Sequence, residues 1–397
     1  MFSCGNGDSD HRLYNPAKVA FEASYNPIFD GCLYPSLVLA LSGSNNADLI
    51  GNGQLFTVSL TAPANGSVLR VVLDSSQLNY VTIMQEELPK KGVRYTFHPM
   101  VKWKYDQLYA TRKQGVVDLS FSCYINDELV DVETLRINYR SANECLLKLE
   151  DTNGRPYDIR WVFAGYVNED HPFIDSILSR VLERGIVSRF EGYQRNAKMV
   201  QDQVFAFWYD ALEQGIAYSS ISCTSNPSRR SNVQHIRFFD EVYRSRQANC
   251  IDACVFFASL LRKIGLKPVI FVEPCHAYLG YYADKNRKKV NLLETTITAW
   301  VNFPELNRSV DANGRLPQQY YNKVKRFLSE EDQTRYQAGK MTFSELKLAV
   351  ARTLFEKASV YNQDNYNANK KYFDDKDNSS YQMLDIELLR KSVQPIN

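Results

Sequence analysis

Short strand-like stretches of hydrophobic and polar residues follow one another in the first third of the chain. Residues 117–124 alternate as a half-buried antiparallel strand does, and turn-forming residues separate this stretch from its neighbours. Several short strands at such spacing are typical of a β-sandwich. We therefore predict an all-β, immunoglobulin-like sandwich over residues 1–150. Its expected strands cover residues 36–41, 54–60, 68–73, 93–98, 115–124 and 132–139.

Helical periodicity follows after residue 150. Apolar residues recur at helical spacing just after Pro172, and again over residues 196–214, where Gly215 ends the pattern. Helices are also expected over residues 234–243, 316–326 and 343–361, a strand over 157–164, and a last docked element over 383–389. The helix over residues 343–361 has an expected buried set of Leu346, Leu348, Val350, Ala351, Leu354 and Phe355. Residues 218–233 predict a polar loop, and residues 366–381, rich in Asn, Asp and Lys, predict a loop or disorder.

Residues 246–280 form the most distinctive stretch. Asn249 is a good N-cap, which makes Cys250 the first residue of an apolar helix that Gly265 ends. The next residues, 269–272, predict a short buried strand, and His276 lies at the edge of a second strand. The stretch therefore predicts a buried helix, a turn and two strands.

A cysteine at a helix N-terminus is chemically unusual. The free amides and the dipole of the helix stabilise a thiolate at this position, and a thiolate is a nucleophile. An imidazole can take the thiol proton and return it to a leaving group, which makes His276 the candidate partner of Cys250. Glu294, on what we expect to be the next strand, is the candidate for orienting His276.

These residues resemble the transglutaminase-like cysteine proteins, a superfamily that also has papain-like proteases. Cys250, His276 and Glu294 follow the order and spacing of its Cys, His and acid, although Glu-Thr-Thr replaces the usual Asp-Pro-Thr. The resemblance covers roughly residues 200–300. It implies an α+β fold with a papain-like, transglutaminase-like catalytic domain over residues 151–300, followed by a helical extension over 301–397.

The resemblance also implies an activity. We expect a cysteine-dependent amide hydrolase or acyltransferase acting on a protein or peptide through a thioester, without a cofactor or metal. A peptidase or amidase is favoured over a transglutaminase, because no calcium-ligand cluster is apparent. The alternative is a binding or scaffolding protein that keeps the fold without turnover.

Other roles of the same residues stay open. Asn249 and Gln247 are candidate oxyanion donors, although Asn249 also serves as a helix cap. The eight cysteines include no CxxC pair, and a zinc site from Cys250, Cys254, Cys275 and His276 has the wrong spacing. Arg229 and Arg230 could bind a substrate carboxylate, but a solvated surface loop is the favoured interpretation of this stretch.

Composition narrows the partners and the compartment. The 397 residues carry a net charge of +2, which gives no electrostatic reason to expect nucleic acid. No stretch is long and apolar enough to span a bilayer. The stretch Phe-Ser-Cys before an acidic segment resembles the lipidation site of a bacterial lipoprotein, so Cys4 would anchor the protein to the cell envelope if translation began upstream of Met1. Otherwise we expect a cytoplasmic protein.

Overall fold

The computed structural model describes residues 19–42, 55–220, 224–225, 228–375, 378 and 380–396. Cys4, the proposed lipid anchor, and part of the predicted loop over residues 218–233 lie outside these residues. The chain forms two units, one of Met1–Leu33 and Ala47–Arg140, the other of Tyr34–Asn46 and Ser141–Asn397. Helices and strands of several sheets make up an α+β protein, which confirms the predicted class. The finer division into three domains stays a prediction.

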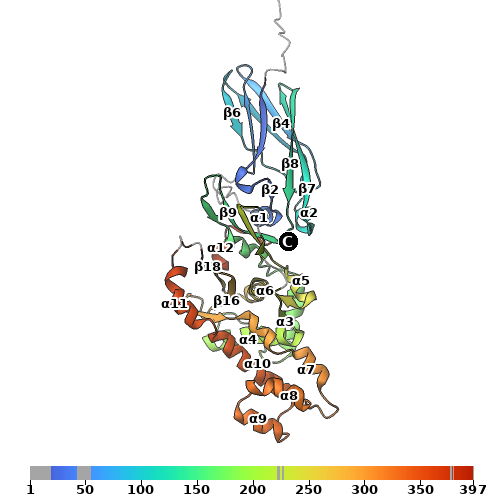
Figure 1. Ribbon diagram of the computed structural model, residues 1–397, viewed down its shortest axis with the longest axis vertical. Coiled ribbons are helices and arrows are strands. Elements are labelled where there is room, and N and C mark those ends of the chain that lie inside the picture. The colour runs from blue at the N-terminus through green and yellow to red at the C-terminus, as the bar shows by residue number, and fades with distance from the viewer. Residues whose placement is uncertain are drawn as a thin grey trace, which may run out of the picture. The chain divides into compact units, whose positions relative to one another are not determined.

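The first unit consists of two sheets, whose strands are coloured blue to green in Figure 1. Its strands are β1 (Phe21–Tyr25), β2 (Cys32–Leu33), β3 (Phe56–Thr61), β4 (Ser67–Leu73), β5 (Thr82–Leu88), β6 (Arg94–Phe97), β7 (Gly115–Ile125) and β8 (Glu128–Tyr139), with the helix α2 (Tyr105–Ala110) between β6 and β7. One sheet has the order β1-β3-β6 and the other β2-β8-β7-β4-β5. All neighbouring strands are antiparallel except β2 and β8.

The alternation in β7 determines which of its side chains enter the core. Val117, Leu119, Phe121 and Cys123 are buried, while the residues between them are not. Phe121 contacts Phe56 of β3 with ring centroids 5.6 Å apart, so side chains of the two sheets pack against each other. A two-residue turn joins β7 to β8, and both of its residues, Asn126 and Asp127, have positive φ, as a type I′ turn requires.

The second unit contains most of the helices. Its elements up to the candidate helix are α1 (Pro35–Ala40), β9 (Glu144–Glu150), β10 (Pro156–Asp158), η4 (Arg160–Tyr166), α3 (Phe173–Glu183), α4 (Ala197–Gln214), β11 (Ala217–Tyr218), β12 (Thr224–Ser225), β13 (Ser231–His235), α5 (Phe239–Ser245) and β14 (Gln247–Ala248). After these come α6 (Cys250–Lys263), β15 (Pro268–Glu273), β16 (His276–Tyr282), β17 (Val290–Leu293), η5 (Thr295–Trp300), α7 (Phe303–Ser309), α8 (Gln318–Val324), η6 (Lys325–Phe327), α9 (Glu330–Gln337), α10 (Phe343–Val360), α11 (Gln363–Phe373), β18 (Gln382–Asp385) and α12 (Ile386–Leu389).

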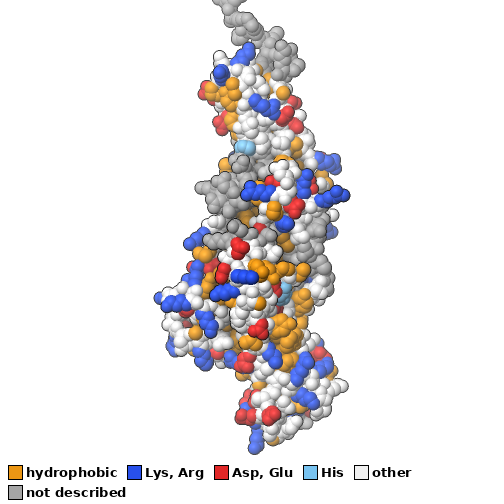
Figure 2. Space-filling model, turned by 60° about the vertical axis from the view of Figure 1, so that its left-hand side comes forward, with side chains coloured by type: hydrophobic (Ala, Val, Ile, Leu, Met, Phe, Trp, Pro, Cys, Tyr) orange, Lys and Arg blue, Asp and Glu red, His pale blue; other side chains and the backbone are white. Residues whose placement is uncertain are grey.

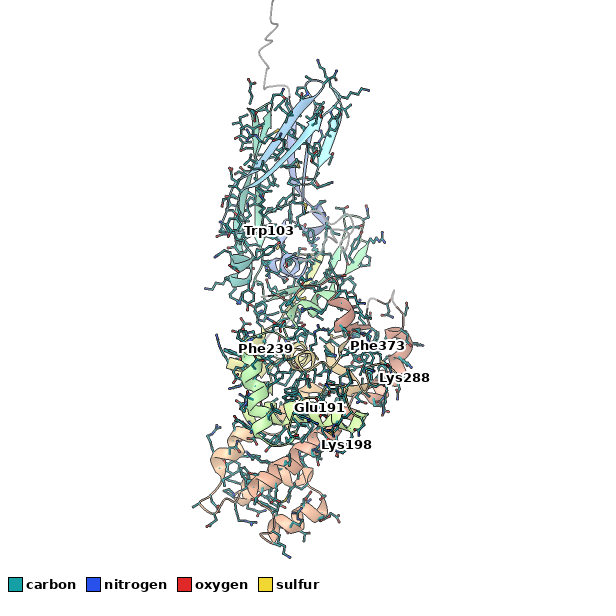
Figure 3. The ribbon with its side chains drawn as sticks, turned by 180° about the vertical axis from the view of Figure 1, so that it is seen from behind. Trp103, Glu191, Lys198, Phe239, Lys288 and Phe373 are labelled. Carbon is teal, nitrogen blue, oxygen red and sulfur yellow. The ribbon has the colours of Figure 1, made fainter. Side chains whose placement is uncertain are left out.

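Helix α6 is buried among aromatic side chains. Phe239 of α5 stacks on Phe256 of α6 with centroids 4.6 Å apart, and Figure 3 shows Phe239 beside this helix. Trp208 of α4 packs on Phe257, the next residue of α6. Because α6 is enclosed on several sides, its sequence is apolar over most of its circumference, as predicted.

An antiparallel sheet of order β17-β16-β15-β18 lies against α6. Val269 and Phe271 of β15 belong to a core cluster that includes Phe373 of α11. Ile270, between them in sequence, is on the opposite face of the sheet and is equally buried. Burial on both faces explains why residues 269–272 are continuously apolar rather than alternating.

Several predicted elements of this unit are wrong. Residues 36–41 form part of α1 rather than a strand, because a continuous apolar run fits a buried helix as well as a strand and Pro35 starts the helix. Residues 363–373 form the helix α11 and not the predicted loop. The ring centroids of its Tyr366 and Phe373 each lie 5.3 Å from that of Phe271, so tertiary packing stabilises this polar sequence as a helix.

Three further differences are local. In the stretch 157–164 only β10 is extended, and the rest is the helix η4. Within the predicted loop over residues 218–233, β13 begins and pairs with β9. Leu348 of α10 is 37% exposed, whereas the other five residues of its predicted set are buried. The helices α3, α4, α6 and α10 and the strand β15 are confirmed.

Charged side chains of both signs are interspersed on the face shown in Figure 2. No helix within the described residues is both long and apolar enough to cross a membrane.

Candidate functional site

A capping box fixes the start of α6 and therefore the place of Cys250. The side-chain oxygen of Asn249 accepts a hydrogen bond from the Asp252 amide at 2.8 Å, and the Asp252 carboxylate accepts one from the Asn249 amide at 2.9 Å. The Asn249 carbonyl accepts from the Ala253 amide. The cap therefore uses the amides of Asp252 and Ala253 and does not use those of Cys250 and Ile251.

Arg237 stabilises this cap from outside the helix. Asp252 is fully buried, and its carboxylate accepts hydrogen bonds from the Arg237 amide at 2.8 Å and from Nη1 of Arg237 at 2.7 Å. Burial raises the pKa of Asp252, although hydrogen bonds from Asn249 and Arg237 oppose the rise. A buried carboxylate without these donors would be costly, so Arg237 is part of what holds the first turn of α6 in place.

His276 is the first residue of β16 and pairs with Glu273 of β15 across a two-residue turn. The second turn residue, Cys275, has a φ of 65°, which is uncommon for a residue with a side chain. The His276 side chain is 29% exposed, so the imidazole is open to solvent on one side.

Glu294 follows β17 directly and is completely buried. Its Oε2 atom lies 2.7 Å from Nε2 of His276 and also accepts a hydrogen bond from Nδ2 of Asn362 at 2.7 Å. Its Oε1 atom accepts from the amide of Thr296 at 3.0 Å and from the Thr296 hydroxyl at 2.7 Å. Burial raises the pKa of Glu294, but the hydrogen bonds and the charge of His276 outweigh this effect, and the pKa is lowered overall.

The imidazole of His276 connects the acid to the thiol. Burial lowers its pKa, but hydrogen bonds to Cys250 and Glu294 and the charge of Glu294 raise it to about 10. Because Nε2 bonds to Glu294, Nδ1 is the ring nitrogen that remains for Cys250. The structure thus brings together the three residues that the sequence predicted as catalytic, and the raised pKa of His276 favours its protonated form.

The two predicted oxyanion donors have different surroundings. Asn249 is buried and its side-chain oxygen caps α6. Gln247 is exposed and belongs to β14, which pairs with β11. Their roles as oxyanion donors stay predictions, and the amides of Cys250 and Ile251 are additional candidates, since the helix cap does not use them.

Sequence reasoning missed two residues that bind Glu294. Thr296 follows within the Glu-Thr-Thr motif, and a donor two residues after an acid is a local pattern that could have indicated it. Asn362 comes from the junction of α10 and α11, 68 residues later, and the sequence carries no signal for this contact.

The sequence also singled out Cys254, Cys275, Arg229 and Arg230. No group of three or more His, Cys, Asp or Glu side chains in the described part of the chain is arranged to hold a metal ion. Cys254 is buried, and burial raises its pKa well above the usual range, whereas Cys275 is exposed. Arg229 and Arg230 line an open hollow with Lys148 and Glu150, and this hollow includes none of Cys250, His276 and Glu294.

Comparison with known proteins adds no family. Models of known protein families give no match to this sequence, and a search of curated proteins finds no relative. The geometry of Cys250, His276 and Glu294 is therefore what indicates a function for this chain.

Proposed function

We propose that the second unit is a cysteine-dependent amide hydrolase or acyltransferase, with hydrolysis of a peptide or amide favoured. The observation that carries this proposal is the hydrogen-bonded series Cys250–His276–Glu294 at the N-terminus of a buried helix. An imidazolium beside a thiolate is the arrangement that activates a cysteine nucleophile.

The reaction would proceed in two stages. The Cys250 thiolate attacks the carbonyl carbon of an amide, and the amides of Cys250 and Ile251 would donate to the oxyanion that forms. His276 gives its proton to the leaving nitrogen as the C–N bond breaks, which leaves a thioester on Cys250 and a neutral imidazole. Water then attacks the thioester while His276 takes its proton. The C–S bond breaks, and acid and thiolate are released.

The architecture around these residues supports a papain-like, transglutaminase-like core. The nucleophile starts a buried helix, α6, that packs on the antiparallel strands β15 and β16. The histidine begins β16 and the acid follows β17, which is the order that the family resemblance implies.

Exposed aromatic side chains favour a peptide over a small amide as the substrate. Tyr218 is 42% exposed, and its strand β11 pairs with β14, just before Cys250. Trp300 ends the helix η5 that follows Glu294, and its ring contacts that of the exposed Tyr361, next to Asn362. Aromatic surfaces of this kind can bind apolar side chains of a polypeptide.

Acylation by p-nitrophenyl acetate tests the proposal. We expect a burst of p-nitrophenol and acetylation of Cys250, seen by mass spectrometry of peptides. Acetylation of that position should vanish in Cys250→Ala, and its rate should fall by about 10²-fold in His276→Ala. His171→Ala, at a histidine of the same unit outside the site, should behave like the wild type. Equal acetylation rates in folded His276→Ala and wild-type protein would overturn the proposal and favour the binding-protein alternative.

A separate experiment shows whether water or an amine accepts the acyl group from the thioester. A peptide library incubated with the protein, with or without a primary amine, distinguishes cleaved peptides from amine-modified glutamines. Cleavage that requires Cys250 supports a peptidase, and modified glutamine supports a transglutaminase.

A further inference from the structure

We propose that Asn362 is a positioning residue of this site, and that the C-terminal helices α10 and α11 therefore complete it. The inference rests on the proposed function. It concerns a residue that lies 112 positions after Cys250.

Asn362 lies at the junction of α10 and α11 and is 5% exposed. Its Nδ2 atom donates to Oε2 of Glu294, the same oxygen that bonds to His276. With the two donors from Thr296 on Oε1, the carboxylate has four hydrogen-bond partners, which is about its full capacity. Asn362 thus holds Oε2 from one side while the imidazole holds it from the other.

The backbone of the helices reinforces this contact. The carbonyl of Ala358, in the last turns of α10, accepts a hydrogen bond from the Glu294 amide at 2.9 Å. One turn after Asn362, Nδ2 of Asn365 donates to Oε2 of Glu273 at 2.6 Å. Glu273 pairs with His276 across the turn between β15 and β16. The start of α11 therefore contacts both the acid and the strand end beside the histidine.

An amide side chain at position 362 stabilises the Glu294 carboxylate better than other side chains of similar size would. It donates to Glu294 without adding charge, so the carboxylate remains ionised while it faces the imidazolium. A carboxylate at position 362 would have no proton to donate at neutral pH and would repel Glu294. An alanine would leave Oε2 with one donor fewer in a buried place.

Other ionisable groups face Glu294 as well, and most of them do not titrate in the acid range. Those that interact with its charge are Cys254 of α6, His276 and Tyr278 of β16, and Tyr218 of β11. Burial raises the pKa values of Cys254, Tyr218 and Tyr278, so these three stay neutral below pH 7. A transition of His276 signals at acid pH therefore reports on Glu294.

The test compares two pH profiles in Asn362→Ala, Asn362→Asp and the matched control Asn367→Ala, an exposed asparagine of α11 whose side chain bonds to Gln363. The quantity compared is the acid limb, the part of each profile that changes as the pH falls. One profile is the rate of Cys250 alkylation by iodoacetamide against pH, and the other is the pH titration of the His276 ring signals by NMR in histidine-labelled protein. We expect the acid limb to move to higher pH by about one unit in Asn362→Ala. It should move further in Asn362→Asp, where two carboxylates share a proton. Asn367→Ala should keep the wild-type limb.

Each outcome decides the inference. If Asn362 had only a structural role, its variants would have a lower melting temperature, but the acid limb of the folded protein would be unchanged. This result would overturn the inference. An equal displacement in Asn367→Ala would overturn it too. If wild-type Cys250 alkylates slowly, the proposed function fails, yet the His276 titration still shows whether Asn362 controls Glu294. Asn362→Ala and Asn362→Asp each test the inference separately, so the test needs only one of them to fold.

Discussion

Glu294 stands where the transglutaminase-like proteins, which this sequence resembles, usually have an Asp followed by Pro-Thr. The longer side chain reaches the imidazole because the residue directly follows β17 and is buried against Thr296 and Asn362. At the level of single residues, the sequence correctly predicted that Cys250, His276 and Glu294 lie next to one another. It could not predict Asn362, because a contact between two distant buried polar residues leaves no pattern in one sequence.

Replacing Glu294 by Gln tests the part played by its charge. The substitution keeps the size of the side chain but removes the negative charge that faces His276. We expect the pKa of His276 to fall from about 10 toward its ordinary value of 6.5. The rate of Cys250 alkylation at pH 7.5 should fall by at least about tenfold. NMR titration of His276 and peptide mass spectrometry measure the two effects, and an unchanged pKa would contradict the assigned role of Glu294.

Helix α6 was predictable as an element, and other elements were not. Its apolar run, the N-cap Asn249 and the stop at Gly265 are all local signals, and each is present in the structure. The helix α11 is polar and was missed, because its stability comes from Tyr366 and Phe373 packing on the sheet. Local patterns thus identified the element that carries the nucleophile, but not the one that supports the acid.

The cap of α6 can be separated from an oxyanion role of Asn249. Asn249→Ala removes the hydrogen bond to the Asp252 amide and should lower the free energy of unfolding by about 1 kcal/mol. Asn249→Ser preserves an N-cap oxygen and should stay within a few tenths of a kcal/mol of the wild type. Urea unfolding measures both changes.

The same two variants test catalysis. Because the side-chain oxygen of Asn249 already caps the helix, we expect Asn249→Ser to acetylate at close to the wild-type rate. A loss of about 10²-fold in folded Asn249→Ser would instead assign the Asn249 amide group to the oxyanion.

The whole molecule divides into a β-rich unit and a larger α+β unit. Strand and helix patterns, together with the family resemblance, predicted the α+β class. They were not enough to place β9, which continues the strand-rich stretch in sequence but pairs with β13 of the second unit. Strand partners separated by many residues depend on the tertiary fold, and hydrophobic patterns do not specify them.

The stability of the folded protein should depend on pH through the ion pair of His276 and Glu294. The folded pKa of His276 is raised, so its contribution is complete below the ordinary value of 6.5 and is lost as the pH rises through about 10. The folded pKa of Glu294 is lowered, so its contribution is complete above the ordinary value of 4.5 and is lost at lower pH.

The difference in melting temperature between the wild type and Glu294→Gln should therefore be largest between about pH 4.5 and 6.5. It should decrease on both sides of that range. Thermal unfolding across pH 3 to 10 measures it, and a difference that stays constant with pH would show that the pair does not contribute to stability in this way.

The most direct test of the central claim compares two cysteines within one protein. Cys275 is exposed, while Cys250 is only partly accessible, so accessibility alone would make Cys275 react faster. At pH 6 an ordinary thiol is almost entirely protonated and reacts slowly, whereas a thiolate paired with an imidazolium reacts well. We predict that limiting iodoacetamide at pH 6 labels Cys250 at least about tenfold faster than Cys275, as measured by peptide mass spectrometry. Faster labelling of Cys275 would contradict the account, because it would show that His276 and Glu294 do not activate Cys250.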